Sequence, residues 1–165
     1  MAEPLSEFAR RFILDPSRRK ELDVPVLLWE SPTLVPGAEK TLDLTWSSPS
    51  AGRLASGEPV VCPLRKGGSP TNAFVMGVTV GRTDNNDVVL NDPSVSRFHA
   101  YFIRDPRKRE IWRLVDADSK NGTWVGPMKL QSNAGVEVHD RAHLRFGDIE
   151  MDLLWPESFF KFIQR

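Results

Sequence analysis

What the chain lacks excludes several classes of protein. Its 165 residues include one cysteine, Cys62, so we expect neither an intramolecular disulfide nor a paired-cysteine metal site. Basic and acidic residues both number 22, which leaves no excess charge for binding bulk nucleic acid or anionic membrane. No apolar run approaches the about 18 residues of a membrane span, and the N-terminus lacks a secretory signal pattern. We therefore expect a cytoplasmic location.

The composition is typical of one globular domain with a short extension. Hydrophobic residues make up 40% of the chain and charged residues 27%, which is ordinary for a folded domain. Nine of the 13 prolines lie in residues 1–70, where short apolar pieces such as residues 26–29 and 42–44 stand between turn signals. This pattern predicts an N-terminal extension of loops and a few short strands over residues 1–58, followed by a domain over residues 59–165.

Both ends of the chain have helical patterns. Residues 5–14 place apolar side chains, among them Phe8 and Phe12, on one side at helical spacing. The helix should end at Asp15, because the proline that follows disfavours helical geometry there. Residues 156–165 are expected to form one or two helical turns that pack back on the domain.

From about residue 60 the sequence is a series of short apolar runs separated by turn residues. Their spacing of about ten residues is typical of an antiparallel sandwich or barrel. The predicted fold class is all-β, a two-sheet antiparallel β-sandwich with a short N-terminal helix and a C-terminal helical turn. The expected strands are residues 60–64, 74–81, 88–90, 98–104, 111–116, 123–125, 135–138, 142–146 and 149–155.

Three short polar motifs lie where expected strands begin or end. They are Gly81-Arg82, Ser96 with His99, and Asn121-Gly122. The pattern Gly-Arg, Ser-x-x-His and Asn-Gly, in this order and at this spacing, resembles the forkhead-associated (FHA) domain over about residues 60–155. The resemblance implies binding of phosphothreonine peptides, no catalytic activity and no cofactor.

The chemistry of a phosphothreonine fits the first two motifs. The group carries about two negative charges and three acceptor oxygens, so its receptor needs a guanidinium, a hydroxyl and free backbone N–H groups. Arg82 would supply the charge; the alternative is a surface ion pair with Asp84 or Asp87. The Ser96 hydroxyl would donate to the phosphate, as the resemblance implies, unless it bonds its own backbone as a turn serine.

The neighbouring residues add further candidates for the phosphopeptide site. Arg97 is either a second cation for the peptide or a solvated charge, and Thr83 is a lesser candidate. The resemblance implies that Asn121 holds the peptide backbone and that Gly122 makes the turn. Lys120 stands where family members often carry a small hydroxyl residue, so it either adds charge or blocks the usual phosphate contact.

His99 has an enzymatic alternative. With Ser96 and Asp105 it would make a hydrolytic triad, but the sequence has no nucleophile-elbow motif around the serine. The resemblance implies instead that His99 braces the binding loops, together with Gly81 and Gly122.

Two further patterns are weaker evidence for a binding site. His139 and His143 have the spacing of a helical zinc pair, but their segment is expected to be a turn and a strand, so no metal site is predicted. Residues 104–109 hold four basic residues. We expect a solvated hairpin tip there, with contact to nucleic acid or an acidic partner as the alternative.

The expected partner is a phosphothreonine-containing protein, either a Ser/Thr kinase or its substrate, with no nucleic acid and no membrane. The protein would then be a signalling adaptor downstream of Ser/Thr kinases. The alternative is a phosphate-independent scaffold on the same sandwich. A phosphorylated threonine of the extension, at Thr33, Thr41 or Thr45, would be a further occupant of the site.

Overall fold

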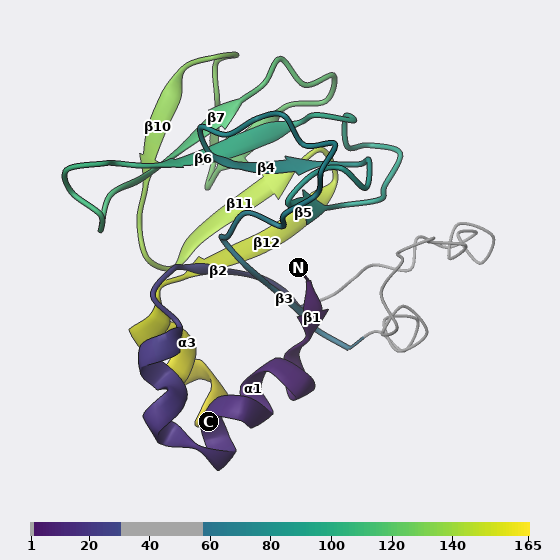
Figure 1. The fold of residues 1–165 in the computed structure, drawn as a ribbon. Coiled ribbons are helices and arrows are strands. Elements are labelled where there is room, and N and C mark those ends of the chain that lie inside the picture. The colour runs from purple at the N-terminus through teal and green to yellow at the C-terminus, as the bar shows by residue number, and fades with distance from the viewer. Residues whose placement is uncertain (1, 31–57) are drawn as a thin grey trace.

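A computed structural model describes residues 2–30 and 58–165. In this part of the chain two β-sheets form the expected all-β sandwich (Figure 1). The larger sheet has the strand order β1 (Glu3–Pro4), β3 (Val60–Pro63), β2 (Val26–Trp29), β12 (Ile149–Leu154), β11 (Ala142–Phe146), β8 (Thr123–Val125) and β9 (Met128–Lys129). The smaller sheet has the order β10 (Gly135–Val138), β7 (Trp112–Asp116), β6 (Ala100–Arg104), β4 (Val78–Gly81) and β5 (Val88–Val89).

Two differences from the expected strands concern the smaller sheet. Strand β4 begins at Val78 and not at residue 74. The alternating apolar pattern before it belongs to a loop, in which the side chains of Val75 and Met76 are exposed. Strand β5 pairs with β4 in parallel, so this sheet is mixed and not wholly antiparallel.

Residues 2–30 contribute strands to the sandwich. Strand β2 lies between β3 and β12 and pairs with both, while β1 pairs with β3. The described part of the expected extension thus supplies two strands to the larger sheet. The apolar piece at residues 42–44 and the candidate threonines Thr33, Thr41 and Thr45 lie outside the described residues.

The core lies between the sheets. The rings of Phe102 in β6 and Phe146 in β11 are fully buried, with their centroids 6.4 Å apart. These two rings join the sheets at their centre because each comes from the inner face of a different sheet.

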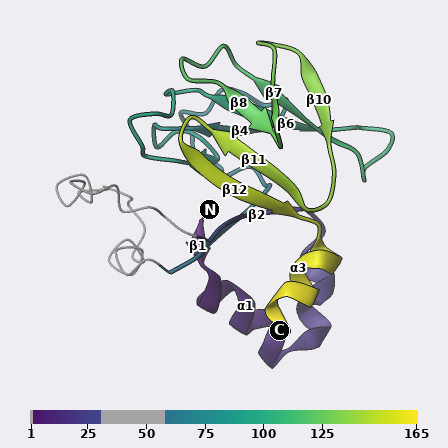
Figure 2. The ribbon, with the colours of Figure 1, turned by 180° about the vertical axis from the view of Figure 1, so that it is seen from behind.

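Helices α1 (Leu5–Leu14) and α3 (Pro156–Ile163) form as expected, with a short 3₁₀ helix, Pro16–Glu21, after α1. Both views place α1 and α3 side by side below the larger sheet (Figures 1 and 2). The rings of Phe8 and Phe159 meet with centroids 5.5 Å apart. Neither helix of the described ranges has the length and apolar character of a membrane span.

Candidate functional site

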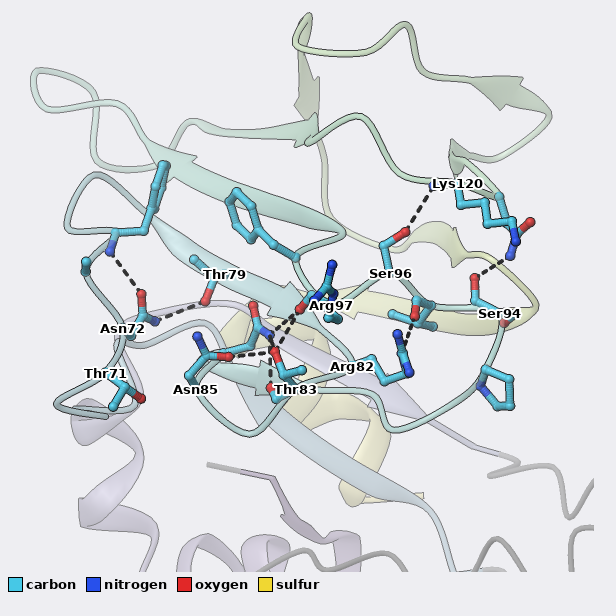
Figure 3. A pocket seen from close by; sticks show the side chains of 17 residues that line it. Thr71, Asn72, Thr79, Arg82, Thr83, Asn85, Ser94, Ser96, Arg97 and Lys120 are labelled. Carbon is cyan, nitrogen blue, oxygen red and sulfur yellow. Dashed lines mark hydrogen bonds between the residues drawn. The ribbon is translucent and has the colours of Figure 1, made fainter.

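Three loops at the ends of the strands line one cleft of about 960 Å³. They are the loop after β4, the loop before β6 and the loop between β7 and β8, and the segment before β4 completes the wall. The cleft runs from Thr71 and Asn72, past Arg82, to Ser94 and Lys120 (Figure 3). All six residues expected to contact a phosphopeptide line it: Arg82, Thr83, Ser96, Arg97, Lys120 and Asn121.

His99 ties two of these loops together from below. Its ring is fully buried; Nδ1 accepts the Ser96 backbone N–H at 2.9 Å, and Nε2 is 2.9 Å from the Gly122 carbonyl oxygen. Because Nδ1 is an acceptor, the proton of the neutral ring lies on Nε2. Burial lowers the pKa of His99, against the opposing effects of the Gly122 carbonyl and the Asp116 charge. Neither ring nitrogen is left for the Ser96 hydroxyl, so the geometry of a hydrolytic triad is not formed.

Two glycines allow the loops to approach. A Cβ atom on Gly81 would lie 2.2 Å from the Arg97 carbonyl oxygen, so only glycine fits where the first two loops touch. Gly122 has a φ of 90°, a left-handed conformation that side-chain-bearing residues rarely adopt. Both residues therefore set loop geometry and do not themselves line the cleft.

The guanidinium of Arg82 forms a hydrogen bond through only one of its three nitrogens among the described residues. Its Nε donates to the Val95 carbonyl oxygen at 3.0 Å, which leaves both terminal nitrogens without a partner among the described residues. The alternative ion pair with Asp84 or Asp87 is not formed. Asp87 is buried and instead contacts Lys66 at 2.7 Å.

Ser96 and Asn121 keep hydrogen-bonding capacity toward the cleft. The Ser96 hydroxyl oxygen accepts the Lys120 backbone N–H at 3.0 Å, so it does not bond its own backbone and its proton remains for another acceptor. The Asn121 amide nitrogen donates to the Ser94 carbonyl oxygen at 2.8 Å. One N–H and the side-chain oxygen of Asn121 are left without partners in the described ranges.

Thr83 and Asn86 hold the first loop against the second. The Thr83 hydroxyl lies 2.6 Å from the Asn85 side-chain oxygen and 3.1 Å from the Arg97 carbonyl oxygen, so its hydrogen bonds are internal. Asn86 is buried, and its amide donates to the Arg97 and Thr83 carbonyl oxygens at 2.7 and 2.9 Å. Asn86 was not among the predicted site residues, although asparagines in a polar run between two strands are a typical loop-stabilising signal.

Asp116, also missed, shapes the third loop. Its buried carboxylate accepts hydrogen bonds from the Ser119 backbone and hydroxyl, at 3.0 and 2.5 Å, and from the Thr123 hydroxyl at 2.6 Å. Burial alone would raise the pKa of Asp116, but these hydrogen bonds outweigh it and lower the pKa. A charged and well-satisfied carboxylate therefore fixes the turn that presents Asn121.

The two histidines at helical spacing do not meet. His139 precedes β11, with Nδ1 3.8 Å from the Glu137 carboxylate, whereas His143 lies within β11 and contacts Asp152 at 2.8 Å. Within residues 2–30 and 58–165 no three side chains of metal-binding type form a group. The Asp152 hydrogen bond raises the pKa of His143.

Comparison with known proteins supports the resemblance to FHA domains. The family model for the FHA domain matches residues 78–147. Over 70 residues the chain is 36% identical to the FHA domain-containing protein PS1 of Arabidopsis thaliana, a segment that covers 42% of this chain and 5% of that protein.

Solved structures agree on the fold. The FHA domain of an Arabidopsis thaliana hypothetical protein aligns with a TM-score of 0.51 and 16% identity, covering 81% of this chain and 87% of that one. Mycobacterium tuberculosis EmbR, solved with a low-affinity phosphopeptide, aligns with a TM-score of 0.50 and 21% identity, covering 90% of this chain and 30% of that one.

The described residues thus have the β-sandwich fold of FHA domains, with a loop cleft at the ends of the strands. Residues 78–147 of this chain match the family model of the FHA domain, as the sequence motifs predicted. Strands β1 to β3, strand β12 and both helices lie outside the matched residues but belong to the same structure.

Proposed function

We propose that this protein is a non-catalytic module that recognises phosphothreonine peptides. One observation carries the proposal: the chain has no net charge, yet Arg82, Arg97 and Lys120 line the cleft with no carboxylate among the described residues of its wall. None of the three forms an ion pair with a described residue. Unpaired cations in a concave site attract an anion.

The remaining hydrogen-bonding groups suit a phosphate on a peptide. The terminal nitrogens of Arg82 and the proton of the Ser96 hydroxyl would donate to the phosphate oxygens, and the Lys120 ammonium would add charge. The free amide atoms of Asn121 would hold the peptide backbone. Such charge-assisted hydrogen bonds are worth about 1.5–3 kcal/mol each, so we expect dissociation constants on the order of micromolar after the cost of ordering the peptide.

We propose the same role for the protein in the cell as its binding chemistry suggests. The protein would act as an adaptor downstream of Ser/Thr kinases, and its partner would be a phosphorylated kinase or kinase substrate. It would carry no catalytic activity, which is supported by the commitment of both His99 ring nitrogens to the backbone. Its cytoplasmic location stays a prediction.

Binding to a phosphothreonine peptide library tests the proposal, followed by fluorescence anisotropy on the selected sequence in its phosphothreonine, phosphoserine and unphosphorylated forms. We expect binding of the phosphothreonine form alone, and a loss of about 10- to 100-fold for Arg82→Ala. Arg107→Ala is the matched control, because Arg107 is an exposed arginine that does not line the cleft. Unchanged affinity in Arg82→Ala would refute the mechanism.

A phosphate-independent scaffold is the second candidate function. It is favoured by Lys120, whose side chain lines the cleft where related domains often carry a hydroxyl residue. Affinity purification before and after phosphatase treatment separates the two candidates. Partners that survive phosphatase would support the scaffold, whereas partners lost on treatment would support the phosphothreonine reader.

A further inference from the structure

An aromatic cluster lies beside the phosphate-binding loops. The rings of Phe74, Phe98 and Tyr101 contact one another, with centroid separations of 4.6 Å (Phe74 to Tyr101), 5.6 Å (Phe74 to Phe98) and 5.9 Å (Phe98 to Tyr101). None of the three belongs to the hydrophobic core or packs against it. We call these three residues the aromatic shelf.

The shelf is partly open to solvent, and two of its rings line the cleft. Phe98 is 40% exposed, and the neighbouring Val75 and Met76 are 83% and 71% exposed. Phe74 and Phe98 line the same cleft as Arg82 and Ser96. The cleft therefore has a cationic part and an apolar part within one concave surface.

Polar contacts fix the loop that carries Phe74. The Lys66 ammonium donates to the Phe74 and Gly77 carbonyl oxygens at 2.6 and 3.0 Å and contacts the Asp87 carboxylate at 2.7 Å. The Phe74 backbone N–H donates to the Asn72 side-chain oxygen at 3.1 Å. Burial would raise the pKa of Asp87, but Lys66 and backbone N–H groups outweigh it and lower the pKa, which favours the carboxylate form of Asp87.

Phe98 has a fixed position relative to the phosphate-binding groups. It lies two residues after Ser96 and directly before His99, whose ring holds the Ser96 backbone. A peptide anchored by its phosphate at Ser96 thus passes or ends near the shelf. An exposed apolar surface of this kind beside a charged anchor is typical of a pocket that selects a neighbouring side chain.

We propose that the aromatic shelf binds an apolar side chain of the phosphorylated peptide, at one position close to the phosphothreonine. The proposal rests on the proposed function and names its substrate class, peptides in which a phosphothreonine is paired with a large aliphatic or aromatic residue. The cations supply phosphate dependence and the shelf supplies sequence selectivity.

A positional scan tests the inference. Phosphothreonine peptides of a serine and alanine background carry a single leucine or phenylalanine at each flanking position in turn. We expect one position to raise affinity about tenfold, because burial of one such side chain accounts for that factor. The preference should vanish in Phe98→Ser and return in Phe98→Leu. It should persist in Val75→Ser, the control, because Val75 is an exposed residue of the loop that carries Phe74 and does not line the cleft.

The results of this scan distinguish failure of the inference from failure of the proposed function. Phosphothreonine binding with no preferred apolar position would overturn the inference and leave the proposed function standing. An equal loss for all peptides in Phe98→Ser would assign the shelf to loop positioning, and a change of sedimenting mass in that variant would assign it to contact with a second copy; both overturn the inference. Absence of any phosphothreonine binding by the unmodified protein would overturn the proposed function itself.

Discussion

The loop cleft and the helical region below the larger sheet are held together by different interactions. At the cleft, buried polar groups such as His99, Asn86 and Asp116 bond the backbone of the loops. In the helical region, aromatic rings of α1 and α3 pack against each other, among them Phe8 and Phe159. Polar bonds fix direction and spacing, whereas apolar packing supplies non-directional free energy.

Because of this difference, we expect the helical region to contribute to stability and the cleft to contribute to binding. In the cleft the loop-holding groups are satisfied internally, and the cations Arg82, Arg97 and Lys120 stay free for a ligand. In the helical region the rings of Phe8, Phe12 and Phe159 are buried, and no described residue of α1 or α3 lines the cleft. Changes in the helical region should therefore alter stability alone, and changes to loop geometry should alter both.

The largest expected effect is on stability. Phe159→Ala removes a fully buried ring between α3 and the rest of the fold, so we expect a loss of about 3–5 kcal/mol in the free energy of unfolding. Urea denaturation measures it, with Ile13→Ala as a control because Ile13 is an exposed residue of α1. Phosphopeptide affinity of the folded variant should be unchanged; a weakened affinity would show that the two regions are coupled.

A change of intermediate effect should reduce both stability and phosphopeptide affinity. Gly81→Ala places a Cβ atom against the Arg97 carbonyl oxygen, so the first two cleft loops must separate at a cost of about 1–3 kcal/mol. Phosphopeptide affinity should fall at least about tenfold although every cation is retained. Gly135→Ala is the control, since its Cβ would make only ordinary contact with Val115. Full affinity in Gly81→Ala would mean that loop spacing is irrelevant to binding.

The smallest effect concerns pH. The pKa of His99 is lowered from 6.5, so below that pH the unfolded chain takes up more protons than the folded one and His99 reduces stability. His143, with its raised pKa, acts oppositely: its contribution is present at low pH and is lost as the pH rises through the folded value. Between about pH 7.5 and about pH 5.5, acid should destabilise His99→Gln less, and His143→Gln more, than the unmodified protein. Urea denaturation of the two variants and the unmodified protein at both pH values measures these changes. If acid destabilised His99→Gln more than His143→Gln, the directions assigned to the two pKa shifts would be wrong.

Much of the sandwich was predictable because its strands alternate and end at turn residues. Strands β8, β10 and β11 and helix α1 have the predicted bounds. The strand predicted for residues 74–81 was too long at its start. Phe74 and Met76 continue the apolar alternation but lie in the loop before β4. The central place of β2 was not predictable either, since pairing with β12, more than a hundred residues away, leaves no local signal.

The candidate site was predictable as a set of residues but not as a geometry. Motifs on strand boundaries identified Arg82, Ser96 and Asn121, which do line one cleft. The sequence could not reveal that the Thr83 hydroxyl is used internally, because its partner Arg97 belongs to another loop. The sequence also could not reveal the aromatic shelf, because Phe74 lies before β4 whereas Phe98 lies just before β6 and Tyr101 lies within it.

The position of β2 also bears on how the chain can be divided. A fragment beginning at residue 59 would leave an open edge on β12 and on β3, a surface that invites aggregation. Conversely, a single cut between residues 30 and 58 would leave β2 hydrogen-bonded on both sides and α1 packed on α3. The two pieces should then reassemble when mixed, which makes this fold a candidate for split-protein complementation, with recovery of the cleft as the readout.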